Sequence, residues 1–226
     1  YAVAPTKIDE FDYPEGDENT YNHYSGSAGV PLEHLWQRIT AATYLADPRF
    51  LNTGALTKES RLLLRRDVKE RVHALAPFLD LMGEPYLVSV PIDDAPSGYQ
   101  QGQHQYWIVD AFTSSRTVPY ASTLPDGRPL RYLRNSVKAV VDAYNGKVHF
   151  YINEPNDPMI QGWTKVFPSL FENLENMPTS LRRHLMVSQA QFELQVQQLL
   201  RYHVTNPRIF YSGDDVWQVP KELYGN

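Results

Sequence analysis

Asp142 and His149 are the side chains whose types and spacing come nearest to a catalytic pair. The Asn145-Gly146 dipeptide between them is typical of a two-residue hairpin turn, and that register places Asp142 opposite His149. A carboxylate beside an imidazole can orient a general base. The pair also fits a surface cross-strand contact, which contributes about 0.2–1 kcal/mol to a hairpin. No G-x-S-x-G, H-E-x-x-H or glycine-rich phosphate motif supplies a nucleophile or a metal, so no catalytic residue is predicted.

A second set of polar side chains flanks the apolar strand expected at 106–112. Hydroxyls and basic groups at a strand end are what an anionic or sugar ligand requires, although the same residues can satisfy free backbone groups in a turn. Residues at the start of the following hairpin could meet them from the other side. Together with the pair above, the candidate binding residues are Asp110, Thr113, Ser114, Arg116, Arg134, Asn135, Lys138, Asp142 and His149.

The distribution of charge excludes several classes of function. The net charge of −5 is accounted for by the first 24 residues, which hold six carboxylates and one lysine. Because the rest of the chain is balanced, there is no surplus of positive charge to bind a phosphate backbone, and no nucleic-acid partner is expected. The chain has no cysteine and its seven histidines are scattered, so neither a metal site nor a cofactor is predicted. No run reaches the ~18 apolar residues of a membrane span.

The hairpin predicted at 137–152 must position the candidate residues. Its two-residue turn pairs Val141 with Phe150 and Ala139 with Ile152. One face is then apolar throughout, whereas the other carries the polar candidates. The apolar face requires helices to cover it.

The remaining pattern predicts an α+β fold, with an antiparallel sheet of about four strands centred on the 137–152 hairpin and covered by helices from both halves. Residues 85–90 and 106–112 are expected to be strands separated by a long polar loop, and residues 57–65 fit either a short helix or an extended segment. Residues 1–30 are expected to form an extended acidic arm, and 31–226 a single α+β domain. Capping residues and prolines predict helices that begin at Pro31, after Asp67, after Asp157, near Thr179 and after Ser188.

Five long motifs carry a resemblance to a known family. They are GSAGVPLEHLWQRI, ESRLLLRRDVKERVHALAPFL, YWIVDAFTSSRTVPYA, LRYLRNSVKAVVDAYNGKVHFYINEPNDP and YHVTNPRIFYSGDDVWQVP. With the chain from DYPEGDENTY onward, they resemble the UPF0182 family of bacterial integral membrane proteins. The resemblance implies that this chain is a fragment of a longer protein, with several transmembrane helices ahead of it, and that it lies outside the cytoplasm. It brings no catalytic residues, and the loop at 92–105 is longer than the short turn usual in the family.

These observations lead us to expect an extracytoplasmic soluble domain of a protein in the cell membrane. We expect it to act as a non-catalytic binding or assembly module of the cell envelope, attached to the membrane through helices outside this chain. Its expected partner is an envelope ligand or another protein, and the sequence does not specify an oligomeric state. Two alternatives stay open: a hydrolase of an envelope polymer that uses Asp110, Asp142 or His149, and a sensor or gate of a transporter.

Overall fold

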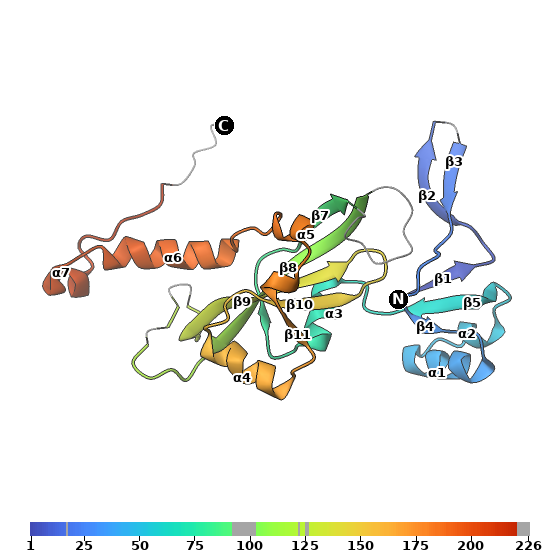
Figure 1. Ribbon diagram of the computed structural model, residues 1–226, viewed down its shortest axis with the longest axis horizontal. Helices are drawn as coiled ribbons and strands as arrows, with labels where there is room; N and C mark the ends of the chain where they lie inside the picture. Colours follow the sequence, from blue (N-terminus) through green and yellow to red (C-terminus); the bar gives the residue numbers. More distant parts are fainter. Residues whose placement is uncertain (17, 92–102, 122, 125–126, 221–226) are drawn as a thin grey trace.

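The computed structural model describes residues 1–16, 18–91, 103–121, 123–124 and 127–220, and its helices and strands confirm the predicted α+β class. The loop predicted between the strands at 85–90 and 106–112 lies mostly outside these residues. The strands of the largest sheet are β6 (Asp80–Leu81), β7 (Tyr86–Pro91), β8 (Gln103–Ser115), β9 (Tyr132–Asp142), β10 (Val148–Ile152) and β11 (Phe171–Asn173). Their order is β11-β10-β9-β8-β6, with β7 also paired to β8 (Figure 1).

The prediction of four strands was wrong, because this sheet has six. The two strands that the sequence missed, β6 and β11, span two and three residues, which is too short to show an alternating pattern. All pairings are antiparallel except that of β10 with β11, which is parallel. The longest strand, β8, pairs with β9 on one side and with the edge strands β6 and β7 on the other.

The hairpin of β9 and β10 exists, but its predicted register was wrong by two residues. Val141 pairs with Val148, and Ala139 pairs with Phe150. The reason is the turn: Oδ1 of Asp142 accepts hydrogen bonds from the backbone N–H groups of Tyr144 and Asn145, each at 2.8 Å, and this holds a wider loop than two residues. A shift of two leaves every side chain on its predicted face, because side chains alternate with a period of two.

Helices cover both faces of this sheet. On one face, α3 (Val68–Leu75) and α4 (Pro158–Val166) bury Val72 and Ile160 against the apolar side of the hairpin. Both helices begin at the predicted caps, since Asp67 accepts from the N–H of Glu70 and Asp157 accepts from the N–H groups at the start of α4. On the other face, the 3₁₀ turn η2 (Leu174–Asn176) and the short helix α5 (Thr179–Arg182) frame Met177 and Leu181, which pack on β7, β8 and β9.

The N-terminal residues form two smaller sheets. The first contains β1 (Ala2–Thr6), β4 (Val30–Pro31) and β5 (Leu56–Leu63), and the second is a ribbon of β2 (Glu10–Glu15) and β3 (Glu18–Asn22). Because β1 pairs with β5, residues before and after position 30 share one sheet. Residues 57–63 are therefore extended, which decides between the two predicted alternatives.

The helix predicted from Pro31 begins four residues later. It is α1 (Leu35–Leu45), followed by the short α2 (Arg49–Asn52), while Pro31 lies in β4 opposite Arg61. The spacing of Leu32, Leu35, Trp36, Ile39 and Ala42 predicts one apolar stripe on this helix. The stripe is largely exposed: 62% of Trp36 and 47% of Ile39 are accessible, whereas Ala42 is buried. The helix begins late because the strand pairing of Val30 and Pro31, and the bond from the N–H of Leu32 to the carbonyl of Ser60, hold this segment extended.

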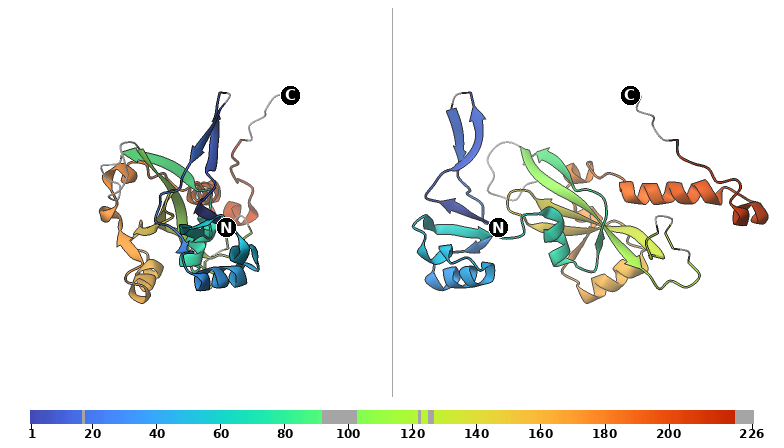
Figure 2. Two further views of the ribbon diagram at one scale, coloured as in Figure 1. Left: turned by 90° about the vertical axis from the view of Figure 1, so that its right-hand side faces the viewer. Right: turned by 180° about the vertical axis from the view of Figure 1, so that it is seen from behind.

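The C-terminal residues form α6 (Gln189–Tyr202) and α7 (Pro207–Ser212), which project from the central sheet on the side opposite the N-terminal sheets (Figures 1 and 2). Ser188 and Gln191 have the spacing of a capping box, but Ser188 makes no side-chain capping bond, so this predicted box is absent. The spacing of Phe192, Val196, Leu199 and Leu200 predicts a buried face on this helix. That prediction is wrong, because 58% of Phe192 and 62% of Leu199 are exposed. None of the helices in the described residues has the length and apolarity that crossing a bilayer requires.

Candidate functional site

Asp110 and Lys138 are brought together as neighbours on β8 and β9, where they form a buried ion pair. The ammonium of Lys138 contacts Oδ1 of Asp110 and donates a second hydrogen bond, of 2.9 Å, to the carbonyl of Met186. Only 5% of the lysine side chain and 13% of the aspartate side chain are accessible. Both charges are therefore engaged inside the protein, where they connect the sheet to the segment that leads into α6.

Thr113 belongs to a buried cluster of hydroxyls around Asp157. Oδ2 of Asp157 accepts hydrogen bonds of 2.6 Å from Thr113 and from Ser136, and Oδ1 accepts one of 2.5 Å from the hydroxyl of Tyr132. The carboxylate, which has no accessible surface, also accepts the N–H groups of Met159 and Ile160 at the start of α4.

The environment of this carboxylate has opposing effects on its pKa. Burial would raise the pKa of Asp157, but the hydrogen bonds from Ser136, Thr113 and Tyr132 outweigh it, so the net shift is downward. Burial and the bond to Asp157 together raise the pKa of Tyr132 to about 12. The sequence identified Asp157 only as a helix cap, because its three hydroxyl donors come from distant positions in the chain.

The predicted pairing of Asp142 with His149 was wrong. His149 lies opposite Val140, and its Nδ1 is 2.7 Å from Oε1 of Glu172 on β11. Asp142 is buried beside His104, whose Nε2 is 3.1 Å from its Oδ1, and it also holds the hairpin turn. The two-residue change in register separates the predicted base from its predicted carboxylate.

The other predicted residues occupy different environments. Asn135 is 1% exposed, and its side-chain amide has no hydrogen-bond partner in the described part of the chain. Ser114 is half-buried, and Arg116 is exposed. Arg134 is also exposed, and it lines a groove beside α6.

This groove has a volume of about 820 Å³. It lies between α6, the C-terminal end of β8 and the N-terminal end of β9. That size is within the range of sites that hold small ligands or a segment of a polymer. Arg134 and Arg131 line one side, and Arg201 comes from the last turn of α6. Glutamines and aromatic rings make up much of the remaining surface, namely Gln191, Gln195, Gln198, Tyr132, Tyr202 and Trp217. No aspartate or glutamate is among the described residues that line the groove.

Sequence reasoning missed the part of this groove that belongs to α6. Gln191, Gln195, Gln198 and Tyr202 are three or four residues apart, which puts them on one face of the helix. That polar stripe was the available signal. It could not be interpreted from the sequence, because nothing local indicates that this face lies against the end of the sheet.

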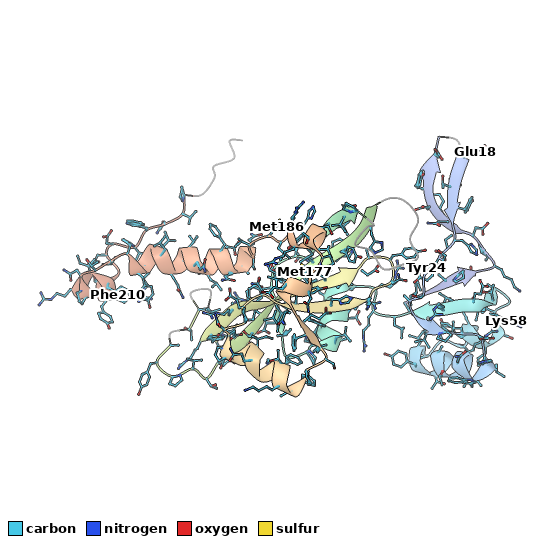
Figure 3. The ribbon with its side chains drawn as sticks, viewed as in Figure 1. Glu18, Tyr24, Lys58, Met177, Met186 and Phe210 are labelled. Carbon is cyan, nitrogen blue, oxygen red and sulfur yellow. The ribbon has the colours of Figure 1, made fainter. Side chains whose placement is uncertain are left out.

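A second hollow, of about 460 Å³, separates the N-terminal sheet from the hairpin turn. Arg71 lies on its wall, and its guanidinium donates to the carbonyls of Leu64, Arg65 and Gly146 at 2.8–3.1 Å. Tyr24 lies between these two parts of the molecule (Figure 3), and its ring is 5.2 Å from that of Tyr144. In the described residues, no group of three or more histidine, aspartate or glutamate side chains is placed to hold a metal ion.

The comparisons with known proteins agree with one another. A family model described as "Uncharacterised protein family (UPF0182)" matches residues 1–226. A UPF0182 protein of Synechococcus sp. strain CC9311 is 74% identical over all of this chain, and one of Prochlorococcus marinus strain MIT 9303 is 65% identical. A UPF0182 protein of Synechococcus elongatus is 46% identical over 99% of the chain. This chain spans about a quarter of the length of these relatives, 23–24% in each. No solved structure matches it.

Proposed function

Since the chain belongs to the UPF0182 family, we propose that it is a non-catalytic binding or assembly module of the cell envelope. In this proposal the chain lies on the extracytoplasmic side, and the full-length protein is held in the cell membrane by helices in the three quarters that this chain does not cover. Its partner is an envelope ligand or an envelope protein.

One observation carries the binding role. The reactive side chains that the sequence singled out are engaged in internal bonds, while the groove beside α6 presents arginine, glutamine and aromatic side chains. Arginine and glutamine donate several hydrogen bonds in fixed geometry, and aromatic rings supply flat contact area. Such a surface binds a ligand without providing a nucleophile or a general base.

The geometry supports the hydrolase alternative less well. A hydrolase needs a base, an orienting group and a site for the reacting atom within hydrogen-bond reach of one another. Asp142 instead holds a turn, Asp110 is paired with Lys138, and His149 faces Glu172. We therefore prefer binding to catalysis.

A thermal-unfolding screen tests the binding role. The purified chain is unfolded in the presence of envelope glycans, lipid vesicles and envelope protein fractions, with a cytoplasmic extract from the same cells as the matched control. A ligand at 100 times its dissociation constant stabilises by ~2.7 kcal/mol, which corresponds to a rise in Tm of roughly 5–10 °C for a chain of this size. Chemical turnover of any of these fractions by the chain would contradict a non-catalytic role.

Cysteine labelling tests the location. The chain has no cysteine, so a thiol introduced at Lys58, an exposed position on β5 (Figure 3), is the single one in this part of the full-length protein. Any cysteine elsewhere in the full-length protein is first replaced by serine. Lys58→Cys should react with a membrane-impermeant maleimide in intact cells. Ser60→Cys, buried on the same strand, is the matched control and should react only after denaturation. Labelling of Lys58→Cys only after the membrane is permeabilised would place the chain in the cytoplasm.

A further inference from the structure

We propose that the groove between α6 and the ends of β8 and β9 binds an anionic saccharide, that is, a sugar chain carrying carboxylate, phosphate or sulfate groups. This inference rests on the proposed binding function and names the class of its ligand. Three features of the groove carry it: unopposed arginines, a stripe of glutamines, and exposed aromatic rings.

The arginines are free to bind an anion. Neither Arg131 nor Arg134 has a side-chain hydrogen bond or an ion pair with any of the described residues, and both side chains are exposed. Their backbones are fixed, because the N–H of Arg131 donates to the carbonyl of Ser115 at 2.8 Å and the carbonyl of Arg134 accepts from Thr113. The guanidinium of Arg201 lies 5.0 Å from the ring centre of Phe210, a stacking that leaves its N–H edge available.

The nearest buried carboxylate does not compete for these arginines. Asp157 accepts three hydroxyls and two backbone N–H groups, and one of the hydroxyls is that of Tyr132 on the groove wall. A carboxylate with five donors has its lone pairs satisfied. The groove therefore presents three positive charges with no lining carboxylate among the described residues. A guanidinium binds a carboxylate, phosphate or sulfate through two parallel N–H donors.

The rest of the lining fits the neutral part of a sugar. Gln191, Gln195 and Gln198 face the groove from one side of α6, and an amide both donates to and accepts from a hydroxyl group. Tyr202 and Trp217 add ring faces, whose negative potential attracts the C–H groups of a sugar ring. Trp217 is held in place by the stacking of its ring on His203, with the ring centres 3.8 Å apart, and by its backbone N–H, which donates to the carbonyl of Leu200.

Two other anionic partners fit less well. A nucleic acid requires a broad basic surface, whereas this chain has a net charge of −5. A lipid surface favours an apolar face with surrounding lysines and arginines, whereas the wall of α6 that lines the groove is rich in glutamine. A saccharide uses the amides, the rings and the arginines together.

Binding measurements on the 226-residue chain test this inference. The probes are an oligogalacturonide, a neutral dextran oligosaccharide of the same length, and phosphatidylglycerol vesicles. The oligogalacturonide should bind, and the neutral sugar should bind much more weakly. Added salt should lower the affinity for the oligogalacturonide, because it screens the attraction between the charges. Arg131→Gln, Arg134→Gln and Arg201→Gln should each weaken binding about tenfold, the factor that follows from losing one hydrogen bond to a charged group.

Matched variants separate groove binding from general attraction. Arg183→Gln removes an exposed arginine that does not line the groove, and its affinity should be unchanged. Trp217→Ala should lower the affinity for the oligogalacturonide and leave the affinity for inorganic phosphate unchanged, because only the sugar contacts the indole ring. Because the substituted side chains are exposed, each variant should keep the Tm of the wild type. An unchanged Tm shows that the variant is folded.

Three results would overturn the saccharide inference: no binding of the oligogalacturonide, equal affinity in the Arg134→Gln variant, or tighter binding of the vesicles through the same arginines. Each leaves the binding module intact if an envelope fraction still raises the Tm of the chain. Turnover of an envelope fraction, by contrast, contradicts the binding function itself, so the two failures are distinguishable.

Discussion

At the scale of single residues, the side chains with the most reactive chemistry hold the fold together. Lys138 and Asp110 satisfy each other across two strands, and Asp157 gathers three hydroxyls while capping α4. A buried charge that loses its partner costs more than the pair contributes, so these positions should be sensitive to substitutions that leave one charge alone.

Lys138→Met should destabilise the chain by about 3–5 kcal/mol, because it leaves the carboxylate of Asp110 buried without a partner. Urea unfolding measures the change. The double variant Lys138→Met with Asp110→Leu should recover much of the loss. Lys69→Met is the matched control, because Lys69 pairs with Glu84 on the surface and its loss should cost less than about 1 kcal/mol. Equal losses at the two lysines would mean that the buried pair has no special role.

Asp157→Asn should cost about 2–4 kcal/mol at neutral pH, since an amide cannot accept from all five donors of this carboxylate. Asp67→Asn makes the same change at the exposed cap of α3 and should cost less than about 0.5 kcal/mol, because asparagine also caps helices.

The loss at Asp157 should also depend on pH. The folded pKa of Asp157 lies below its ordinary value of 3.8, so the carboxylate stabilises the fold fully above pH 3.8 and loses this contribution as the pH falls below it. The difference in unfolding free energy between wild type and Asp157→Asn should therefore narrow below pH 3.8. A difference that stays constant down to pH 2 would show that the charge itself contributes nothing.

At the scale of elements, the sequence correctly predicted the features that follow from side-chain alternation in strands and from helix caps. The hairpin faces were predicted correctly because a register shift of two residues leaves each side chain on the same face. The caps at Asp67 and Asp157 were predicted correctly because each bonds to backbone groups two or three residues away. The register was wrong because it is fixed by the side chain of Asp142, which competes with the usual Asn-Gly turn. The groove was beyond prediction because its two walls, at 131–134 and 191–202, are far apart in the chain and meet only on folding.

Glycine substitutions test this account of the turn. Gly146 has a φ of 66°, and a Cβ placed there would lie 2.8 Å from the guanidinium of Arg71. Gly146→Ala should therefore destabilise by about 1–2 kcal/mol. Gly162→Ala is the matched control: this glycine lies inside α4 in open space, so alanine should stabilise by about 0.5–1 kcal/mol. If both variants were stabilised, the turn would not need a positive φ at position 146.

At the scale of the whole molecule, a few polar contacts connect the N-terminal sheets to the central sheet. Arg71 joins the segment after β5 to the hairpin turn through three backbone carbonyls. Across the same boundary, the N–H of Ser25 donates to the hydroxyl of Tyr144, and the N–H of Ser27 donates to Oδ1 of Asn145. The apolar clusters on the two sides contain different residues, so the polar contacts must carry much of the coupling.

Removing the arginine should thus separate the two parts without unfolding either. In Arg71→Leu, hydrogen exchange at the amides of Ser25 and Ser27 should accelerate about tenfold, as expected from losing roughly 1.4 kcal/mol of the hydrogen bonding of one partly buried guanidinium. The amides of Val109 and Ala139 in the central sheet should keep their protection, because their cluster does not depend on Arg71. Arg66→Leu is the matched control: Arg66 lines the same hollow but makes no side-chain bond with the described residues, so it should change neither set of amides. Equal acceleration in the central sheet would instead mean that the two parts unfold as one cooperative unit, with Arg71 contributing to the stability of the whole.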